Sequence, residues 1–517
     1  MHETHAFIMR LVVLMLIAVV AMATAQAAPK LPSFFSDGMV LQRDLPLAIW
    51  GWAQPAEKIH VEIAGKSADA VTGPDGRWSA TLPALAAGGP FTLTVRGDET
   101  LTLNDVYAGE VWLCSGQSNM AFTLNHSLKA ADEIAKADLP LLHVFTVREQ
   151  FSLTPLDNVK GRWTACTPAS AGGISAVSYY FGKDLVRALN VPVGLVVSSI
   201  SGTPAEAWTT RDALAGDPAY ASQLDPWKDV TPSQFVEIGK AYTAFQHERD
   251  VVHPAAVKEA KEKGLPEPPA PVSPKLRLHD CPGAVYDGMI APLVPLSLRG
   301  VLWLQGENNS GRPAQYAKLL QTMIYLWRAN WNRPDLAFDI VEIANFEAVT
   351  PQPVESGWAT LRESQRKALV LPNTGLAVTI DLGEANNIHY LNKAPAGQRA
   401  ARWALASVYK QPGVVASGPM ETSVSAEGDT LVVHFANVAE GLSARGGGPL
   451  KEFAVGNGDG KFVWADATIA GHTVRVHADG VVKPSVVRYA WADNPEGANL
   501  VNSEDLPAAP FEASVTR

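Results

Sequence analysis

The chain has 517 residues, of which 47% are hydrophobic, so it is long enough for about three domains with sizeable cores. Its formal net charge is −10 and it contains no block of basic residues, which argues against nucleic acid as a partner. The 14 tryptophans are as compatible with a sugar-handling surface as with the cores of β-sandwiches.

The N-terminus has the pattern of a cleavable export signal. Arg10 closes a short charged segment, and the apolar run Leu11–Ala23 that follows is too short to span a membrane comfortably. Ala25-Gln26-Ala27 then supplies small residues at the spacing of a cleavage site. We therefore expect residues 1–27 to be a signal peptide and the mature protein to be periplasmic or secreted, with no membrane contact after cleavage.

Residues 29–104 are expected to form an N-terminal β-sandwich domain. Three short β-prone runs, Leu47–Trp52, His60–Ala64 and Phe91–Val95, are separated by turn-forming residues. One of these turns, Pro74-Asp75-Gly76, is a good hairpin signal. No residues in this region have catalytic spacing, so a structural or binding role is the default.

Residues 105–411 alternate between strand and helix patterns. The apolar runs are continuous, which is typical of parallel strands covered on both faces. The expected strands are Val111–Cys114, Leu141–Val147, Val193–Ile200, Gly300–Leu304, Phe338–Ile343 and Leu376–Ile380. The expected helices are Ser175–Leu189, Tyr316–Trp331, Trp358–Ala368 and Ala394–Tyr409. This pattern predicts a three-layer α/β fold whose ligands bind beyond the carboxyl ends of the strands.

Two further segments frame the expected α/β domain. Residues 210–280 interrupt it with polar helical material at Gln234–Lys263 and a proline-rich return. This insertion is either a lid or a surface excursion with no role in chemistry. Residues 412–517 alternate apolar and polar positions between glycine-rich joints, which predicts a C-terminal β domain.

The three cysteines do not suggest a disulfide framework or a metal site. Cys114 lies in a predicted strand and is most simply a buried thiol. Cys166 and Cys281 can pair after export, but the odd count leaves one thiol free in any case. No cysteine or histidine cluster has metal-ligand spacing, so we expect neither a metal nor another cofactor.

The stretch Glu110–Met120 carries the first chemical signal. The strand Glu110–Cys114 stops at Ser115-Gly116, and Ser118 follows at once between polar neighbours. A serine at a sharp strand-to-helix turn exposes its hydroxyl and has backbone N–H groups nearby, as a nucleophile requires. The alternative is that Ser118 only caps the following helix.

Three more polar clusters follow predicted strands. They are residues 198–204, with Gly202 able to offer an unobstructed N–H; residues 303–309, with Gln305 and asparagines able to donate side-chain N–H groups; and residues 381–389, ending in His389. A histidine at the carboxyl end of a sheet strand, near nucleophile candidates, is a candidate general base.

These four blocks, in this order, resemble the SGNH hydrolases, and more closely the sialate O-acetylesterase family and related carbohydrate acetylesterases. The resemblance rests on GQSNM at 116–120, Gly202, WLQGENN at 303–309 and IHYLNK at 388–393. It covers the whole mature chain and implies a flavodoxin-like α/β/α domain flanked by two β domains. The segment AWADNP at 490–495 also looks like the C-terminal signature of that family.

The resemblance implies roles for these residues. Ser118 attacks an acetyl carbonyl and His389 takes its proton. The N–H groups of Ser118 and Gly202 hold the oxyanion, with either Gln305 or Asn309 as third donor; each such donor is typically worth about 3 kcal/mol in the transition state. The neighbouring polar residues of the same motifs, expected to contact substrate, are Gln117, Asn119 and Glu307.

The chain departs from the family pattern in front of the histidine. The family commonly has an aspartate two or three residues earlier, where this chain has Asn386 and Asn387. An asparagine can orient an imidazole but supplies no full negative charge to the imidazolium. Three alternatives follow: a serine–histidine dyad, an acid relocated to Glu384 or Asp381, or impaired catalysis.

The sequence therefore predicts an exported serine esterase that removes O-acetyl groups from carbohydrate. The family resemblance implies sialic acid as the acetylated sugar, whereas related enzymes act on acetylated plant polysaccharides such as xylan. The rival from another class is a carbohydrate-binding protein on a degenerate hydrolase scaffold. A lipase-like or thioester hydrolase shares the chemistry, but no long apolar face for an acyl chain is evident.

Overall fold

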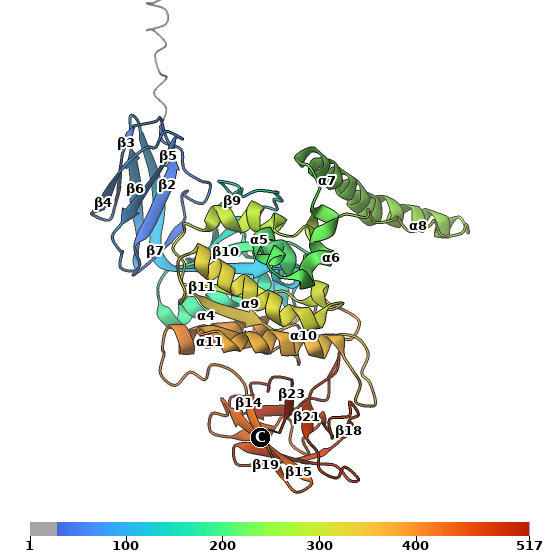
Figure 1. Ribbon diagram of the computed structural model, residues 1–517. Helices are drawn as coiled ribbons and strands as arrows, with labels where there is room; N and C mark the ends of the chain where they lie inside the picture. Colours follow the sequence, from blue (N-terminus) through green and yellow to red (C-terminus); the bar gives the residue numbers. More distant parts are fainter. Residues whose placement is uncertain (1–27, 516–517) are drawn as a thin grey trace, which may run out of the picture.

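The computed structural model describes residues 28–515, so the expected signal peptide at 1–27 lies outside the described residues. Within residues 28–515, two β-rich regions lie at opposite ends of a central α/β body (Figure 1). Across residues 28–515 we find no helix with the length and apolar character needed to cross a membrane.

The N-terminal region consists of short strands that alternate buried and more exposed residues. Its strands are β1 (Val40–Gln42), β2 (Leu47–Trp52), β3 (Lys58–Ile63), β4 (Lys66–Val71), β5 (Arg77–Leu82) and β6 (Gly88–Arg96). β2 pairs antiparallel with β5, and β3 pairs antiparallel with both β4 and β6. In β2, β3 and β5 the alternation buries one face of the strand in a common apolar core, whereas β1 is buried throughout and β4 is the most exposed strand.

One long strand, β7 (Thr100–Gly116), joins this region to the central body. Its first part pairs antiparallel with β6, and its last part runs between two parallel strands of the central sheet. β7 runs through residues 104 and 105, the boundary expected between the first two domains, without a linker. Where β7 enters the central sheet, the buried Glu110 carboxylate is paired with Arg43 (2.5 Å) and Arg299 (2.7 Å). Burial works against ionisation of Glu110, but these arginines lower its pKa overall.

The central sheet has the strand order β13-β12-β11-β7-β10-β8-β9. The strands from β13 to β8 are parallel, and only β9, at the edge, runs antiparallel to its neighbour. Apart from β7 they are β8 (Leu139–Val147), β9 (Gly161–Cys166), β10 (Val193–Ser199), β11 (Gly300–Leu304), β12 (Ala337–Val341) and β13 (Thr374–Ala377). This confirms the predicted α/β fold with a mostly parallel sheet.

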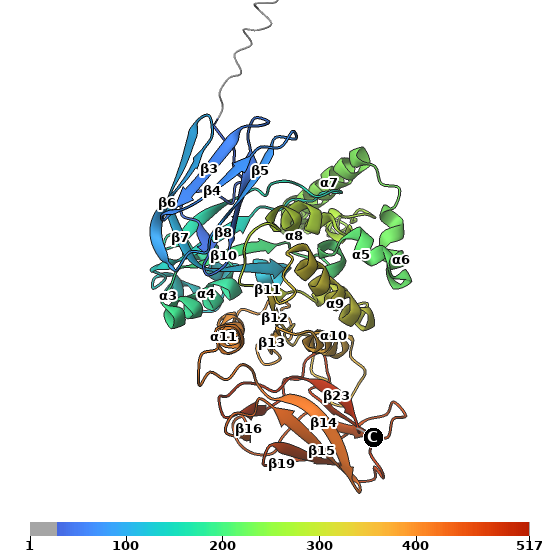
Figure 2. The same ribbon diagram turned by 60° about the vertical axis from the view of Figure 1, so that its left-hand side comes forward.

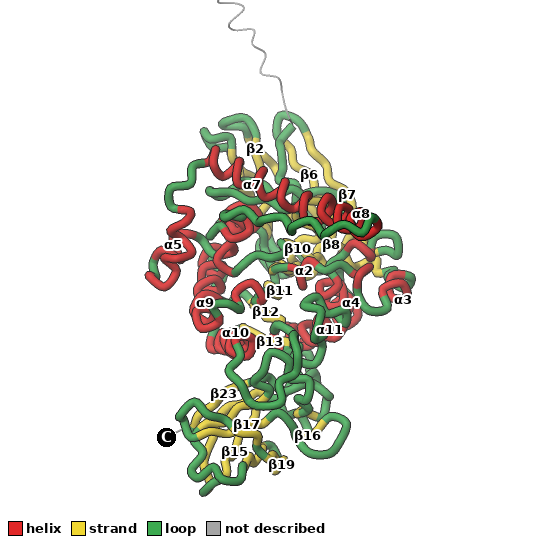
Figure 3. The backbone as a smooth tube through the Cα atoms, turned by 90° about the vertical axis from the view of Figure 1, so that its right-hand side faces the viewer, coloured by secondary structure: helices red, strands yellow, loops and turns green. Residues whose placement is uncertain are grey.

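Helices cover both faces of the sheet, which explains the continuous apolar strands. α4 (Ala176–Leu189) and α11 (Ala394–Trp403) pack together on one face, and α9 (Pro313–Asn330) and α10 (Gly357–Arg366) on the other (Figures 2 and 3). The side chains of Ser175 and Ser356 cap α4 and α10. Two short helices, α2 (Ser118–Ala121) and α3 (Ala130–Ile134), follow β7.

The segment at 210–280 is largely helical. It contains α5 (Arg211–Ala215), α6 (Ala221–Leu224), α7 (Pro232–His247) and α8 (His253–Glu262). α7 begins with a capping box formed by Thr231 and Gln234, and one π-helical turn connects it to α8. The resulting rod projects away from the body (Figure 1), and most of its residues are exposed.

The C-terminal region is built from antiparallel strands. One sheet has the order β14-β15-β20-β19 and another β18-β17-β21-β23, while β16 pairs with β22. The bounds are β14 (Met420–Glu427), β15 (Thr430–Ala436), β16 (Leu442–Ala444), β17 (Phe453–Gly456), β18 (Val463–Trp464), β19 (Asp466–Ala470), β20 (Thr473–His477), β21 (Val486–Tyr489), β22 (Leu500–Asn502) and β23 (Phe511–Ser514).

Candidate active site

Ser118 is the first residue of α2, directly after the central strand β7. The N-cap position is Gln117, and no side chain caps this helix, so the alternative that Ser118 serves as a helix cap is wrong. The turn requires glycine at 116, where φ is +141° and a Cβ would collide with the carbonyl oxygen of Leu304. Ser118 is half-buried, and its hydroxyl has no hydrogen-bond partner among residues 28–515.

The neighbouring strands bring two other polar blocks to the same edge of the sheet. Gly116 of β7 lies opposite Ser199 of β10 and Leu304 of β11. The Gln117 N–H donates to the Leu304 carbonyl (3.0 Å). Residues 198–204 and 303–309 therefore flank the Ser118 turn, as the order of the parallel strands requires.

The side chain of Gln117 lies inside this arrangement. It is buried, and its Oε1 accepts from Gln305 Nε2 (3.2 Å) and from the Asn308 N–H (3.4 Å). Gln117 therefore braces the turn against the β11 loop, and the structure does not place it as an open substrate contact.

The two amides predicted as third oxyanion donors are engaged internally. Gln305 is fully buried, and its Nε2 donates to Asn309 Oδ1 (2.8 Å) and the Thr203 carbonyl (3.2 Å). Asn309 Nδ2 donates to Glu206 Oε2 (2.8 Å), while its Oδ1 also accepts from the Ala205 N–H (2.9 Å). Their role is to tie the β10 and β11 loops together.

Asn308 occupies a more open position between these loops. It is half-buried, and its Nδ2 donates to the Gly202 carbonyl (2.9 Å). An amide nitrogen has two hydrogens, so one remains for a ligand. Gly202 itself is exposed, has φ +71°, and has no atom within 4 Å of the position a Cβ would take. This pair offers open donors beside Ser118.

Asn119 connects the nucleophile turn to the histidine loop. Its Nδ2 donates to the Ile388 carbonyl (3.1 Å) and to Glu307 Oε1 (2.5 Å), and its Oδ1 accepts from Lys393 Nζ (2.5 Å). Asn119 and Ile388 directly adjoin Ser118 and His389 in the chain. The structure therefore brings the predicted nucleophile and base into one region, although no hydrogen bond links their side chains.

The electrostatic surroundings favour a neutral imidazole. Burial lowers the pKa of Lys393 to about 7, and burial also raises the pKa of Glu307. Glu307 Oε2 is buried without a hydrogen-bond partner in the described part of the chain. Burial, and after it the Lys393 ammonium, lowers the pKa of His389. The histidine ring is half-buried and lies near-parallel to the Phe122 ring, with centroids 6.5 Å apart.

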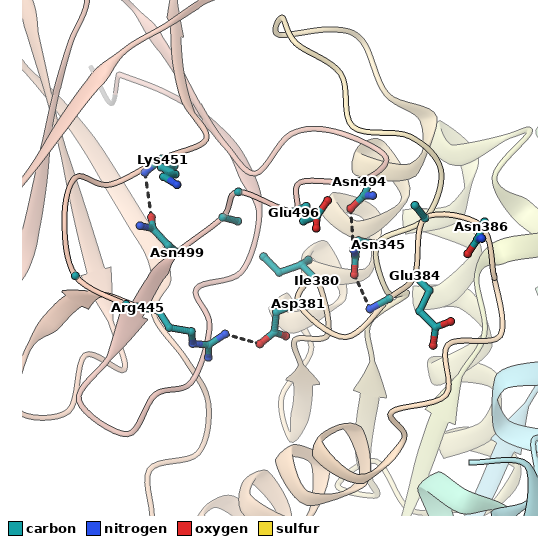
Figure 4. A pocket seen from close by; sticks show the side chains of 16 residues that line it. Asn345, Ile380, Asp381, Glu384, Asn386, Arg445, Lys451, Asn494, Glu496 and Asn499 are labelled. Carbon is teal, nitrogen blue, oxygen red and sulfur yellow. Dashed lines mark hydrogen bonds and ion pairs between the residues drawn. The ribbon is translucent and has the colours of Figure 1, made fainter. Parts of the chain in front are cut away.

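Neither carboxylate proposed as a relocated acid contacts the imidazole. Asp381 binds Arg399 through two oxygens (2.6 and 2.8 Å) and Arg445 (2.7 Å), and Figure 4 shows it turned towards Arg445. Burial opposes ionisation of Asp381, but these arginines lower its pKa overall. Glu384 accepts from the Leu391 N–H (2.7 Å). Both carboxylates therefore hold the loop in place.

Asn386 and Asn387, at the usual aspartate position, also make no hydrogen bond to the His389 ring. Asn387 Oδ1 accepts from the backbone N–H of His389 (3.0 Å), and its Nδ2 donates to Glu384 (3.3 Å). Asn386 is exposed and lines a different cavity. Over residues 28–515, no carboxylate or amide hydrogen-bonds the His389 ring, so none of the four predicted partners is placed as the acid of a triad.

A polar cavity of about 770 Å³ lies between the histidine loop and the C-terminal region (Figure 4). Glu384 and Asn386 line it on one side, and Arg445, Lys451 and Asn499 on the other. Asn345 Nδ2 donates to Asn494 Oδ1 (2.7 Å) and links the two regions at its wall. Neither Ser118 nor His389 lines this cavity, so it adjoins the candidate site without containing it.

The cysteines and metal-ligating residues add no chemistry at this site. Cys114, Cys166 and Cys281 are free and buried, so the possible pair between Cys166 and Cys281 is not formed. Burial raises the pKa of Cys114 and Cys166 to about 12. Within the range 28–515, no group of three or more histidine, cysteine or acidic side chains is arranged to hold a metal ion.

Two residues at the site were not singled out from the sequence. Asn308 is adjacent to a predicted donor, and only the turn at 307–309 decides which amide faces outwards. Lys393 precedes α11 and reads as a solvated helix start, yet it is fully buried. The IHYLNK motif, whose last residue is Lys393, was the one signal that pointed towards it.

The chain is similar to known carbohydrate esterases. Residues 282–406 match the family model described as carbohydrate esterase, sialic acid-specific acetylesterase. Sialate O-acetylesterase of Rattus norvegicus is 26% identical over 558 residues, covering 97% of this chain and 98% of the rat protein. The Homo sapiens protein of that name is 24% identical, covering 94% of this chain and 92% of its own length.

A solved structure gives a stronger match. The crystal structure of a carbohydrate acetylesterase from Xanthomonas citri matches with a TM-score of 0.79 at 35% identity, covering 94% of this chain and 99% of that one. The fold and the site thus define an ester hydrolase of the carbohydrate esterases. The chain belongs to the carbohydrate acetylesterases and is similar to the sialate O-acetylesterases, which confirms the resemblance read from its motifs.

Proposed function

We propose that this enzyme removes O-acetyl groups from carbohydrate with Ser118 as nucleophile and His389 as base. The observation that supports it most directly is the hydrogen bond from Asn119 Nδ2 to the Ile388 carbonyl, which joins the residue after Ser118 to the residue before His389. The similarity to proteins named sialate O-acetylesterase and carbohydrate acetylesterase supports the acetyl ester as substrate.

In the first step, Ser118 Oγ attacks the acetyl carbonyl carbon and its proton passes to His389. The carbonyl oxygen becomes an oxyanion, which the N–H groups of Ser118 and Gly202 and the free amide hydrogen of Asn308 stabilise. The tetrahedral intermediate collapses to acetyl-Ser118 as the sugar oxygen leaves with the proton from His389. Water then attacks the acetyl group, gives its proton to His389, and acetate leaves as Ser118 regains its hydrogen.

A dyad is consistent with the surroundings of His389. Burial and the Lys393 ammonium lower the pKa of His389, which favours the neutral imidazole that can accept a proton. The imidazolium that forms lacks a carboxylate partner, so the transition state is less stabilised than in a triad. Because the neutral imidazole is available as a base, we favour a working dyad with lower turnover than a triad over a catalytically impaired protein.

Two substrate classes remain in the proposal. The names of the mammalian relatives favour acetylated sialic acid, and the Xanthomonas citri structure is described more broadly as a carbohydrate acetylesterase. The alternative substrate is acetylated xylan or another plant polysaccharide. Export to the periplasm or medium fits either substrate. Cleavage after residue 27 predicts that the intact mass of the exported protein matches a chain starting at Ala28.

The decisive experiment measures hydrolysis of p-nitrophenyl acetate by the wild type and by Ser118→Ala and His389→Ala. We expect the serine variant to lose at least about 10³-fold in kcat, and the histidine variant a comparable amount. Equal rates in all three proteins, or no hydrolysis by any, would overturn the mechanism. Tight glycan binding without acetate release would instead support the non-catalytic carbohydrate-binding alternative.

Chain-length selectivity tests the third alternative. If the enzyme is an acetylesterase, p-nitrophenyl butyrate should be a poorer substrate than the acetate. A preference for esters longer than butyrate would point to a lipase-like or thioester hydrolase. Acetate release from O-acetylated sialic acid and from acetyl-xylan oligomers, followed by NMR, would then rank the two sugar classes.

A further inference from the structure

The N-terminal region contains a second cleft, lined by tryptophan and separate from the catalytic residues. It has a volume of about 510 Å³, and Trp50, Trp52 and Trp78 line it together with Leu156 and Pro292. None of Ser118, Gly202 and His389 contributes to it. The established family membership assigns no role to this region, and catalysis as proposed does not use it.

The strand pattern explains how aromatic rings come to face this cleft. In β2, Leu47, Ile49 and Gly51 are buried, while the alternate residues Trp50 and Trp52 are only half-buried. Trp52 lies opposite Arg77 and Trp50 opposite Ser79 in the β2–β5 pairing. The outward face of this two-stranded sheet therefore carries two indoles and two polar side chains.

The two tryptophans differ in how firmly they are held. The Trp50 ring meets Phe35 edge-on with centroids 4.6 Å apart, which fixes it against the core. No ring contact is recorded for Trp52 among residues 28–515, and its backbone pairs with Lys30. Trp52 is therefore the ring whose removal should disturb the fold least while changing the cleft most.

Polar side chains stand at the rim of the cleft. Arg77 donates to Asp157 (2.6 Å) and lies 3.6 Å from Asp75, and about half of each of the Arg77 and Asp157 side chains is exposed. The Arg77–Asp157 pair also connects the N-terminal hairpin to a loop of the central body. The rim thus offers both hydrogen-bond donors and acceptors, and its two carboxylates outnumber its one guanidinium.

This combination fits a neutral glycan chain. Pyranose rings have apolar C–H faces and a girdle of hydroxyls, so they are recognised by aromatic faces with polar groups at the edge. An anionic ligand is disfavoured by the excess of carboxylates at the rim and by the net charge of −10.

The extent of the cleft favours a chain over a single sugar. Val71, which is 64% exposed, lines this cleft and also a second hollow of about 510 Å³ on the surface of the paired strands β3 and β4. The two hollows therefore meet at one exposed apolar residue. Such a surface suits a ligand that continues beyond one binding pocket.

We propose that the cleft formed by Trp50, Trp52 and Arg77 is a secondary binding site for the neutral backbone of an acetylated polysaccharide. The proposal rests on the acetylesterase function proposed above and names the substrate class of that function. Holding the polymer at a second point raises the local concentration of its acetyl groups at Ser118 without changing the chemistry.

The test compares Trp52→Ala with the wild type in affinity gel electrophoresis on deacetylated xylan, glucomannan and hydroxyethylcellulose. We expect at least one of these polymers to retard the wild type and Trp464→Ala, but not Trp52→Ala. Trp464 is a matched control because it is 37% exposed on the C-terminal region and donates to the Pro351 carbonyl. Trp52→Phe keeps an aromatic face and should restore part of the retardation.

Kinetics provide the second readout. For Trp52→Ala we expect the KM for acetylated xylan to rise about tenfold, with p-nitrophenyl acetate kinetics unchanged. Circular dichroism and thermal unfolding check that the variant is folded. A wild type that none of the three polymers retards, or equal behaviour of wild type and Trp52→Ala, would overturn the proposal.

Other outcomes reassign the cleft. Retardation by polysialic acid instead of the neutral polymers would refute the neutral glycan. A dimer of the wild type that Trp52→Ala dissociates would show that a second copy of the chain covers this face. A wild type without any esterase activity would refute the proposed function. The binding site would then be tested separately by the electrophoresis result.

Discussion

At the end of β7, the residues on both sides of Ser118 are fixed by side-chain hydrogen bonds to neighbouring loops, through Gln117 to Gln305 and through Asn119 to Glu307. In the loop after β13, by contrast, the ring of His389 has no hydrogen-bond partner within residues 28–515, although its backbone N–H is bound by Asn387. The nucleophile turn is thus held rigidly, whereas the base depends on packing against Phe122 and on nearby charge.

Under the proposed mechanism, this difference predicts that activity is limited on the histidine side. An enzyme with a pre-organised oxyanion site but an unassisted imidazole keeps the electrostatic stabilisation of the transition state and loses part of the help to proton transfer. Substitutions near Ser118, on the nucleophile side, should therefore lower kcat. Substitutions near His389, on the histidine side, should shift the pH dependence of kcat/KM.

Asn308 tests the nucleophile side, and the largest effect is expected here. Asn308→Ala removes the open amide beside Gly202, and we expect kcat for p-nitrophenyl acetate to fall about 10²-fold with a small change in KM. Asn386→Ala is the matched control, because that asparagine is exposed on the histidine loop. Full activity in Asn308→Ala would return the donor role to Gln305 or Asn309.

Lys393 links the two sides, and its removal should have an intermediate effect. Lys393→Met deletes the charge that contacts Asn119, and we expect kcat/KM to fall about tenfold as that amide loses its partner. Because the ammonium lowers the pKa of His389, its loss should raise that pKa and move the acid limb of the kcat/KM profile to higher pH.

Other titratable groups near His389 can also affect its pKa. Glu384 lies on the same loop, Glu307 reaches the loop through Asn119, and His126 packs against Phe122. A profile measured at constant ionic strength for wild type, Lys393→Met and the exposed-lysine control Lys136→Met separates the effects. If activity falls while the acid limb stays in place, Lys393 is only a packing residue.

The sequence predicted the layered fold well because its signals are local. Continuous, β-branched apolar runs such as Val193–Val197 favour strands buried on both faces, and β10 includes that run. The course of β7 was not predicted, because its first residues alternate like an edge strand and its last are uniformly apolar. Only the tertiary pairing shows that one strand serves two regions.

The site was predicted as a set of blocks but not in its details. Strand order guarantees that Ser118, Gly202 and residues 303–309 meet, since the ends of neighbouring parallel strands share an edge. The turn that follows β11 decides that Asn309 faces inwards and Asn308 outwards, and sequence spacing does not encode that choice. Burial of Lys393 likewise depends on Tyr390 and Phe122, which close over it.

Asn387 provides the smallest and most direct test of the histidine side. Asn387→Asp restores a negative charge two residues before His389, at a side chain that already binds the histidine backbone. A nearby carboxylate favours the imidazolium, so the pKa of His389 should rise by about one unit and kcat/KM at high pH should increase about fivefold. The matched control Asn386→Asp adds the same charge at an exposed position and should change neither quantity. An unchanged rate with a raised pKa would show that the carboxylate acts only through space, and that the ring orientation, rather than the missing charge, limits this base.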